Sequence, residues 1–166
     1  MKKIVVGLVL ALLLVGALTV SAEDKIFASW NQKGHMNIYG SIGYNYWGFD
    51  VSPGIEFILG EFNIGPVPFD WGGMARGIVG FDLFSGYGFN WGAGALASLH
   101  MGLVWNLDFY AALGLGISGY SGYPFRFGFS SFNGLSYKLS DKFFVLLEGG
   151  YTVWTSIWGV GVVVKL

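Results

Sequence analysis

Residues 89–101 read FNWGAGALASLHM, and this stretch decides the fold because apolar side chains alternate along it with small or polar ones. Phe89 and Trp91 fall on one face of an extended chain, whereas Asn90 and Ser98 fall on the other. A period of two residues is that of a β-strand whose two faces meet different surroundings. The stretch therefore predicts a strand, and the same alternation continues through the rest of the chain.

Turn residues divide this alternation into eight segments. The predicted strands span residues 36–48, 50–61, 71–83, 87–101, 105–118, 125–138, 142–153 and 156–166. Each is long enough for a tilted strand that crosses a bilayer, which needs about 9–11 residues. An even number of alternating strands can close on itself and leave no unpaired edge. We predict an all-β fold, an eight-stranded antiparallel up-and-down transmembrane β-barrel.

The composition indicates that lipid, rather than water, surrounds this barrel. The chain has 15 Phe, 9 Tyr and 7 Trp, whereas charged residues make up only 11% of it. A soluble domain covers its surface with charge to stay dispersed. After residue 22 the sequence has no apolar run near 18 residues, so the remaining way to span a bilayer is a closed barrel. A soluble barrel of the lipocalin kind remains the alternative.

The first 22 residues have the pattern of a secretory signal peptide. Lys2 and Lys3 precede an uncharged apolar run over residues 4–20, and Ala22 offers a small residue for cleavage. The alternative is an uncleaved N-terminal anchor helix. We expect residues 1–22 to be the signal peptide, residues 23–35 an N-terminal periplasmic lead-in, and residues 36–166 the transmembrane barrel. A short helical plug is the alternative for residues 23–34.

Several classes of site are excluded by composition. The chain has no cysteine, which removes disulfides, thiolate metal sites and a lipid-anchoring cysteine. Without Lys2 and Lys3 it carries 7 basic and 10 acidic residues, hence a net charge of −3, and nucleic-acid binding needs a basic patch. His35 and His100 lie too far apart in sequence to indicate a metal site. We expect no metal, no cofactor and no nucleic-acid partner.

The inward faces of the predicted strands carry a few charged residues. Glu56 and Arg76 fall on neighbouring strands, almost opposite each other, and Glu148 falls at similar depth. Asp82 and Arg126 fall nearer the outer mouth. Charges in a narrow lumen should pair, because unpaired buried charges are costly. This interior charge network is either a structural plug or a gate in which Arg76 exchanges partners between Glu56 and Glu148.

Tryptophans mark the ends of the predicted strands. Aromatic residues form girdles at both interfaces of a membrane barrel. The alternative is the ordinary core of a soluble β-sandwich. The predicted girdle consists of Trp47, Trp71, Trp91, Trp105, Trp154 and Trp158.

A catalytic alternative lies around the turn at residues 102–107. His100 and Asp108 flank this turn, and Ser98 shares a face with His100. Such a set could act as nucleophile, base and orienting acid. The simpler interpretation is a histidine that is hydrogen-bonded inside the lumen. We therefore expect no enzymatic activity, and keep as alternatives a lipid-modifying enzyme and a surface-binding barrel that uses its short outer loops.

The predicted strand at 125–138 has an ambiguous pattern. In the strand at 125–138, Phe127 and Phe129 alternate in one phase and Phe132 in the other. A bulge near residues 130–131 would keep Phe127 and Phe129 on the outward face, and we favour it. Residues 61–70 are expected to form the longest turn, on the periplasmic side.

The chain from about residue 36 to 166 resembles the small eight-stranded outer-membrane barrels, the OmpA transmembrane-domain and OmpX kind. The last strand is similar to the C-terminal assembly signal of that family, although it ends in Leu rather than Phe or Trp. Its alternating residues are Trp158, Val160, Val162, Val164 and Leu166. The resemblance implies the outer membrane of a diderm bacterium, contact with the outer-membrane assembly machinery, a monomer, and a structural or minimal pore-like role.

Overall fold

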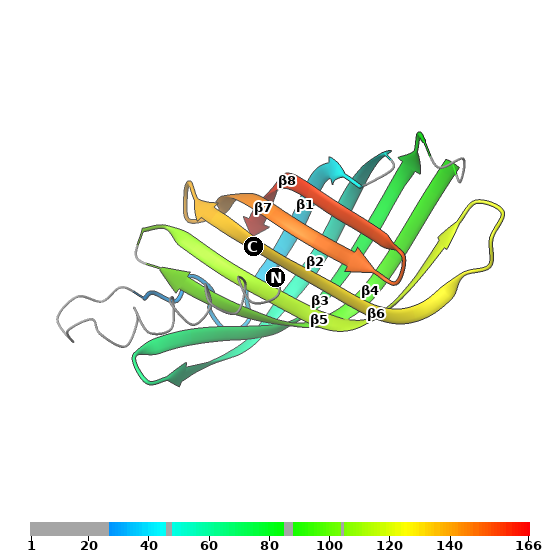
Figure 1. Ribbon diagram of the computed structural model, residues 1–166. Helices are drawn as coiled ribbons and strands as arrows, with labels where there is room; N and C mark the ends of the chain where they lie inside the picture. Colours follow the sequence, from blue (N-terminus) through cyan, green and yellow to red (C-terminus); the bar gives the residue numbers. More distant parts are fainter. Residues whose placement is uncertain (1–26, 46–47, 85–87, 104) are drawn as a thin grey trace, which may run out of the picture.

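The computed structural model describes residues 27–45, 48–84, 88–103 and 105–166. Every strand pairs antiparallel with its sequence neighbour, and β8 pairs with β1, so the sheet closes into a barrel (Figure 1). The strands are β1 (Met36–Tyr44), β2 (Gly48–Ile64), β3 (Val67–Asp82), β4 (Gly88–Leu103), β5 (Leu107–Tyr120), β6 (Arg126–Lys138), β7 (Phe143–Thr152) and β8 (Thr155–Lys165). This confirms the eight-stranded all-β barrel. Within the described ranges, no helix is long and apolar enough to cross a membrane.

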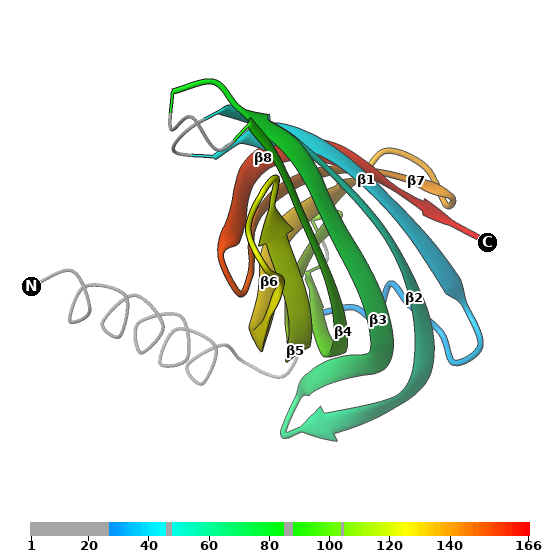
Figure 2. The same ribbon diagram turned by 90° about the vertical axis from the view of Figure 1, so that its right-hand side faces the viewer.

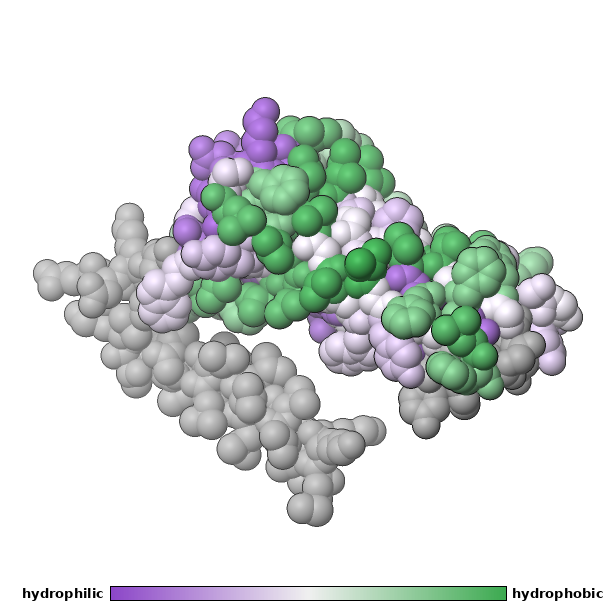
Figure 3. Space-filling model, turned by 90° about the horizontal axis from the view of Figure 1, so that it is seen from above, coloured by the Kyte–Doolittle hydropathy of each residue, from purple (hydrophilic) through white to green (hydrophobic). Residues whose placement is uncertain are grey.

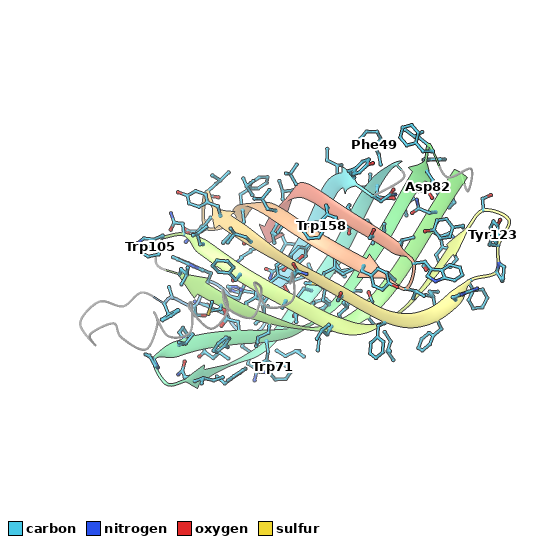
Figure 4. All side chains as sticks on the ribbon, viewed as in Figure 1. Phe49, Trp71, Asp82, Trp105, Tyr123 and Trp158 are labelled. Atoms are coloured by element: carbon cyan, nitrogen blue, oxygen red, sulfur yellow. The ribbon has the colours of Figure 1, made fainter. Side chains whose placement is uncertain are left out.

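Both ends of the described chain lie at the same end of the barrel, because the number of strands is even. We call this end the proximal mouth; it carries the turns at residues 65–66, 105–106 and 139–142. The opposite end is the distal mouth, with the turns at 83–84, 121–125 and 153–154. Figure 4 places Trp71 and Trp105 towards the proximal mouth and Phe49, Asp82 and Tyr123 towards the distal one.

The two faces of each strand are divided as the alternation predicts. On β2, Ser52 and Glu56 are fully buried in the lumen, whereas Val51 and Phe57 are about half exposed on the outside. The fully buried residues that the structure describes include more polar and charged side chains than hydrophobic ones. This reverses the usual arrangement of a soluble domain. Figure 3 shows the outside as broad hydrophobic areas with smaller hydrophilic patches.

The β2–β3 hairpin is longer than the sequence predicts. Residues 61–70 were expected to form a long turn, but the ladder continues to the pair Ile64 and Val67, leaving a turn of Gly65 and Pro66 (Figure 2). The rings of Phe62 and Phe69 stack across the strands at 5.5 Å. The tip of this hairpin extends beyond the β3–β4 ladder, which begins at the pair Asp70 and His100. Pro66 lies in this unpaired part, so it costs no hydrogen bond to β4.

Strand β6 keeps one regular phase. Phe127 and Phe129 are exposed on the outside and Phe132 is buried inside, without any bulge in either ladder. The predicted bulge is therefore wrong, although the outward phenylalanines are correct. The cause is the turn to β7: Leu139 pairs with Phe143, so three residues lie between them instead of two. One extra turn residue shifts the register by one and moves every side chain to the other face.

Candidate functional site

An ion pair crosses the middle of the lumen. The Arg76 guanidinium on β3 donates through Nη2 to Glu148 on β7, and both side chains are completely buried. Arg76 Nη2 also lies 3.0 Å from the Ser52 hydroxyl. The guanidinium carbon is 5.0 Å from the Tyr39 ring centre and 4.8 Å from that of Phe132. Arg76 is therefore enclosed by one carboxylate, one hydroxyl and two aromatic faces.

Glu148 collects hydrogen bonds from three other strands. Ser41 on β1 and Arg76 on β3 donate to its Oε1, and the Tyr110 hydroxyl on β5 donates to its Oε2 at 2.5 Å. These strands alternate around the barrel with β7, so none of them is its neighbour. The contacts therefore run across the lumen and fill it at this depth.

A second layer gathers around Glu56 on β2. Its carboxylate accepts from Asn37 Nδ2 at 2.8 Å, from Tyr39 Oη at 2.6 Å and from the Ser98 hydroxyl. His100 Nε2 lies 2.9 Å from Glu56 Oε1. With four partners, Glu56 is held on the wall of the lumen next to the Arg76–Glu148 layer, to which Tyr39 connects it.

Glu56 and Arg76 were expected almost opposite each other, and the structure places them two residues away from direct opposition. Arg76 stands opposite Gly54 in the β2–β3 ladder, and Glu56 stands opposite Met74. The two charged side chains are therefore diagonal neighbours, and each turns to a different partner. Arg76 pairs with Glu148, whereas Glu56 pairs with His100.

Asp82 and Arg126 lie at the distal mouth, apart from the central pairs. Asp82 accepts from Asn90 Nδ2 at 3.0 Å and from Asn45 Nδ2 at 3.3 Å. The Arg126 guanidinium lies 3.6 Å from the Trp154 ring centre. Each therefore belongs to a local contact at the rim.

Ser98, His100 and Asp108 come together, but not as a nucleophile and its base. His100 Nδ1 lies 3.0 Å from Asp108 Oδ2, as a base and its orienting acid would. Its other nitrogen faces Glu56, and the Ser98 hydroxyl also donates to Glu56. All are buried in the lumen. The arrangement favours an imidazolium held between two carboxylates over a serine activated for attack.

Residues of the N-terminal lead-in enter the proximal mouth, through contacts that the sequence did not predict. The Ser29 hydroxyl donates to Asp70 at 2.8 Å, and the Asn31 amide donates to the same carboxylate at 3.2 Å. Trp30 Nε1 lies 3.0 Å from two carbonyls at the β4–β5 turn, and Lys165 Nζ donates to the Trp30 carbonyl at 2.9 Å. A segment without alternation carries no signal for these particular contacts. The segment was expected as a lead-in, with a short helical plug as the alternative, and its described part, 27–35, docks without forming a helix.

The tryptophans divide between several environments. Trp71 and Trp105 are exposed near the proximal mouth, and Trp158 is 71% exposed on the outward face of β8. Trp91 is partly buried, and Trp154, in the distal turn, is covered by Arg126. Trp47 and the predicted signal peptide lie outside the described residues.

Comparison with known proteins supports the architecture. No family model and no curated protein matches the chain. A barrel from the de novo design of transmembrane β-barrels matches 82% of this chain and 98% of its own length, with a TM-score of 0.56 and 14% identity. The attachment invasion locus protein Ail of Yersinia pestis matches 80% of this chain and 96% of its own, with a TM-score of 0.50 and 15% identity. The chain therefore has the fold of the eight-stranded transmembrane β-barrels.

Proposed function

We propose that this protein is an outer-membrane β-barrel of a diderm bacterium whose lumen is closed by the Arg76–Glu148 pair. Residues 1–22 act as the export signal, and residues 36–166 form the membrane-embedded unit, a monomer of the OmpA and OmpX kind. The observation that carries the proposal is that this fully buried pair joins β3 to β7 across the lumen. The closed barrel has a structural role, and it becomes a minimal pore when the pair opens.

The outward surface supports a membrane location. Large hydrophobic side chains stand exposed along every strand, from Ile42 on β1 to Val160 on β8. A continuous apolar surface of this kind makes a soluble protein aggregate, whereas hydrocarbon solvates it. The buried charged side chains Arg76, Glu56 and Glu148 are inside, where they bind other protein groups instead of lipid.

The same pair makes opening rare. Separating Arg76 from Glu148 leaves two charges in a lumen that has no room for bulk water, which is energetically costly. In the proposed gate, Arg76 moves from Glu148 towards Glu56. Hydrogen bonds from Asn37 and Tyr39 hold the Glu56 carboxylate in place. The N-terminal segment at the proximal mouth forms a second barrier in series, centred on Trp30.

The test is single-channel recording of the protein refolded in detergent and inserted into planar bilayers. Wild type is expected to be silent, with rare brief openings. Arg76→Ala is expected to open more often, and Trp30→Ala/Arg76→Ala more often still. Lys142→Ala removes a positive charge from an exposed turn and serves as the matched control, with wild-type behaviour.

Two results would contradict this function. Steady conductance of wild type, unchanged in Arg76→Ala, would mean that the pair does not close the lumen. Silence of the folded and inserted double variant would rule out a gate at Arg76 and leave only the structural role. Circular dichroism verifies the β content of every variant before recording.

A further inference from the structure

Two carboxylates and two amides meet inside the distal mouth. They are Asp50 on β2, Asp82 on β3, Asn90 on β4 and Asn45 just after β1, and all four side chains are buried. Asp50 stands opposite Gly80, and Gly80 stands opposite Asn90 in the next ladder. A Cβ added at Gly80 would lie only 1.7 Å from Asp50 Oδ1. Glycine therefore provides the space in which the Asp50 carboxylate lies over β3.

Two oxygens of this cluster accept no hydrogen bond. Asn45 Nδ2 donates to Asp50 Oδ2 at 2.5 Å and to Asp82 Oδ1 at 3.3 Å. Asn90 Nδ2 donates to Asp82 Oδ1 at 3.0 Å. Asp50 Oδ1 and Asn90 Oδ1 have no hydrogen-bond partner, although their residues are only 2% and 1% exposed. Buried acceptors without a donor are costly, and the cost is greater for a carboxylate.

Both atoms without a partner are acceptors, so a cation can satisfy them together. Asp50 forms no ion pair with any basic residue that the structure describes. The described residues also contain no group of three or more His, Cys, Asp or Glu that could share a metal ion. The cluster supplies only two carboxylates. The amide oxygen of Asn90 is the third oxygen that could bind a metal ion there. Carboxylate and amide oxygens are ligands for hard divalent cations.

We propose that Asp50, Asp82 and Asn90 form a binding site for a divalent cation, with Ca²⁺ preferred. When the ion binds, a half-turn of the Asn90 carboxamide directs Oδ1, in place of Nδ2, towards the carboxylates, and Asp82 exchanges the Asn90 hydrogen bond for the ion. Ca²⁺ accepts irregular sets of oxygens that are completed by water, whereas Mg²⁺ requires near-ideal octahedral geometry. With two carboxylates, the expected dissociation constant is about 10⁻⁴–10⁻³ M, as in extracellular calcium modules. The ion joins β2, β3 and β4 at the distal mouth.

The first test is thermal unfolding of the protein, refolded in detergent, in EDTA and in increasing CaCl₂ or MgCl₂. An ion that binds only the folded barrel raises the unfolding midpoint as its concentration passes the dissociation constant. Wild type is expected to gain stability in Ca²⁺ and less in Mg²⁺. Asp50→Asn is expected to lose the Ca²⁺ dependence. Glu61→Gln, an exposed acid on the projecting β2–β3 hairpin, is the control and should respond as wild type does.

A second variant works in the opposite direction. Asn90→Asp adds a third carboxylate, so calorimetric titration with CaCl₂ should show about tenfold tighter binding, because ligand charge tunes such sites. In EDTA the same variant should be less stable than wild type, since it adds repulsion to the cluster. The proposal is overturned if wild type shows no response up to about 10 mM Ca²⁺, well above the expected range. Equal Ca²⁺ responses in wild type and Asp50→Asn would also overturn it, because binding would then lie elsewhere.

Discussion

Arg76 on β3 and Glu148 on β7 form an ion pair across the barrel lumen, and neither side chain is exposed to solvent. The two residues are 72 positions apart in sequence and belong to strands that are not neighbours. A contact of this kind cannot be made by local structure. It forms only when the barrel has closed, and it ties opposite walls together.

Removing one member of this pair should be costly, whereas removing both should not. Arg76→Met is expected to lower the free energy of unfolding by about 3–5 kcal/mol, because the buried Glu148 carboxylate is left without a counter-charge. Arg76→Met/Glu148→Leu should recover most of that loss, since apolar side chains can replace a buried pair. Urea unfolding in detergent, followed by tryptophan fluorescence, measures each variant.

The matched control is the surface pair of Lys138 and Asp141, 2.8 Å apart. Asp141 lies in the β6–β7 turn, and the hydrogen bond that Lys138 donates to its carboxyl holds the pKa of that carboxyl below its usual value. The Asp141 carboxylate is 95% exposed and water screens such a charge, so Asp141→Asn should leave the urea midpoint unchanged. A loss equal to that of Arg76→Met would mean that burial is not what makes the central pair important.

Ser98 is expected to matter for stability and not for lipid chemistry. Its hydroxyl donates to the buried Glu56 carboxylate, so Ser98→Ala should cost about 1.5–3 kcal/mol, as for a hydrogen bond to a charged group. Lipid turnover by vesicle-embedded protein should be the same for Ser98→Ala and wild type. Turnover by wild type that disappears in a folded Ser98→Ala barrel would instead restore the catalytic alternative.

The docking of the N-terminal segment depends on Asp70. Its carboxylate accepts from the Ser29 hydroxyl and from the Asn31 backbone amide. Asp70→Asn should speed hydrogen exchange of the Asn31 amide by about tenfold or more, because bonds to charged groups contribute 1.5–3 kcal/mol. Asp141→Asn makes the same chemical change in an exposed turn and should leave that exchange rate alone. Equal rates in Asp70→Asn and wild type would show that other contacts hold the segment.

Glycines in the barrel are not equivalent. A Cβ at Gly114 would lie 1.9 Å from the Ala95 carbonyl oxygen, so Gly114→Ala forces the backbone to move. The expected cost is about 1–3 kcal/mol, as for overpacking. At Gly40 a Cβ meets nothing within 4 Å, and Gly40→Ala should be neutral or slightly stabilising. Urea unfolding of the two variants side by side tests this difference.

The register of β6 shows where sequence reasoning stops. The alternation of Phe127 and Phe129 was correctly interpreted as outward, but the expected bulge was absent. The number of residues in the turn between Leu139 and Phe143 sets the register of β6 without a bulge. A turn of two and a turn of three differ little in sequence, yet they place opposite faces of a strand towards the core.

What the sequence by itself determined is the alternation, and hence the strand number, the closed all-β fold and the identity of the inward residues. These follow from local spacing, because a period of two assigns each side chain to a face. Only the tertiary structure decided that Arg76 binds Glu148, that His100 binds Glu56 and that Trp30 enters the proximal mouth. Such contacts join non-neighbouring strands or a segment without alternation, so they depend on register and closure, which turn geometry sets.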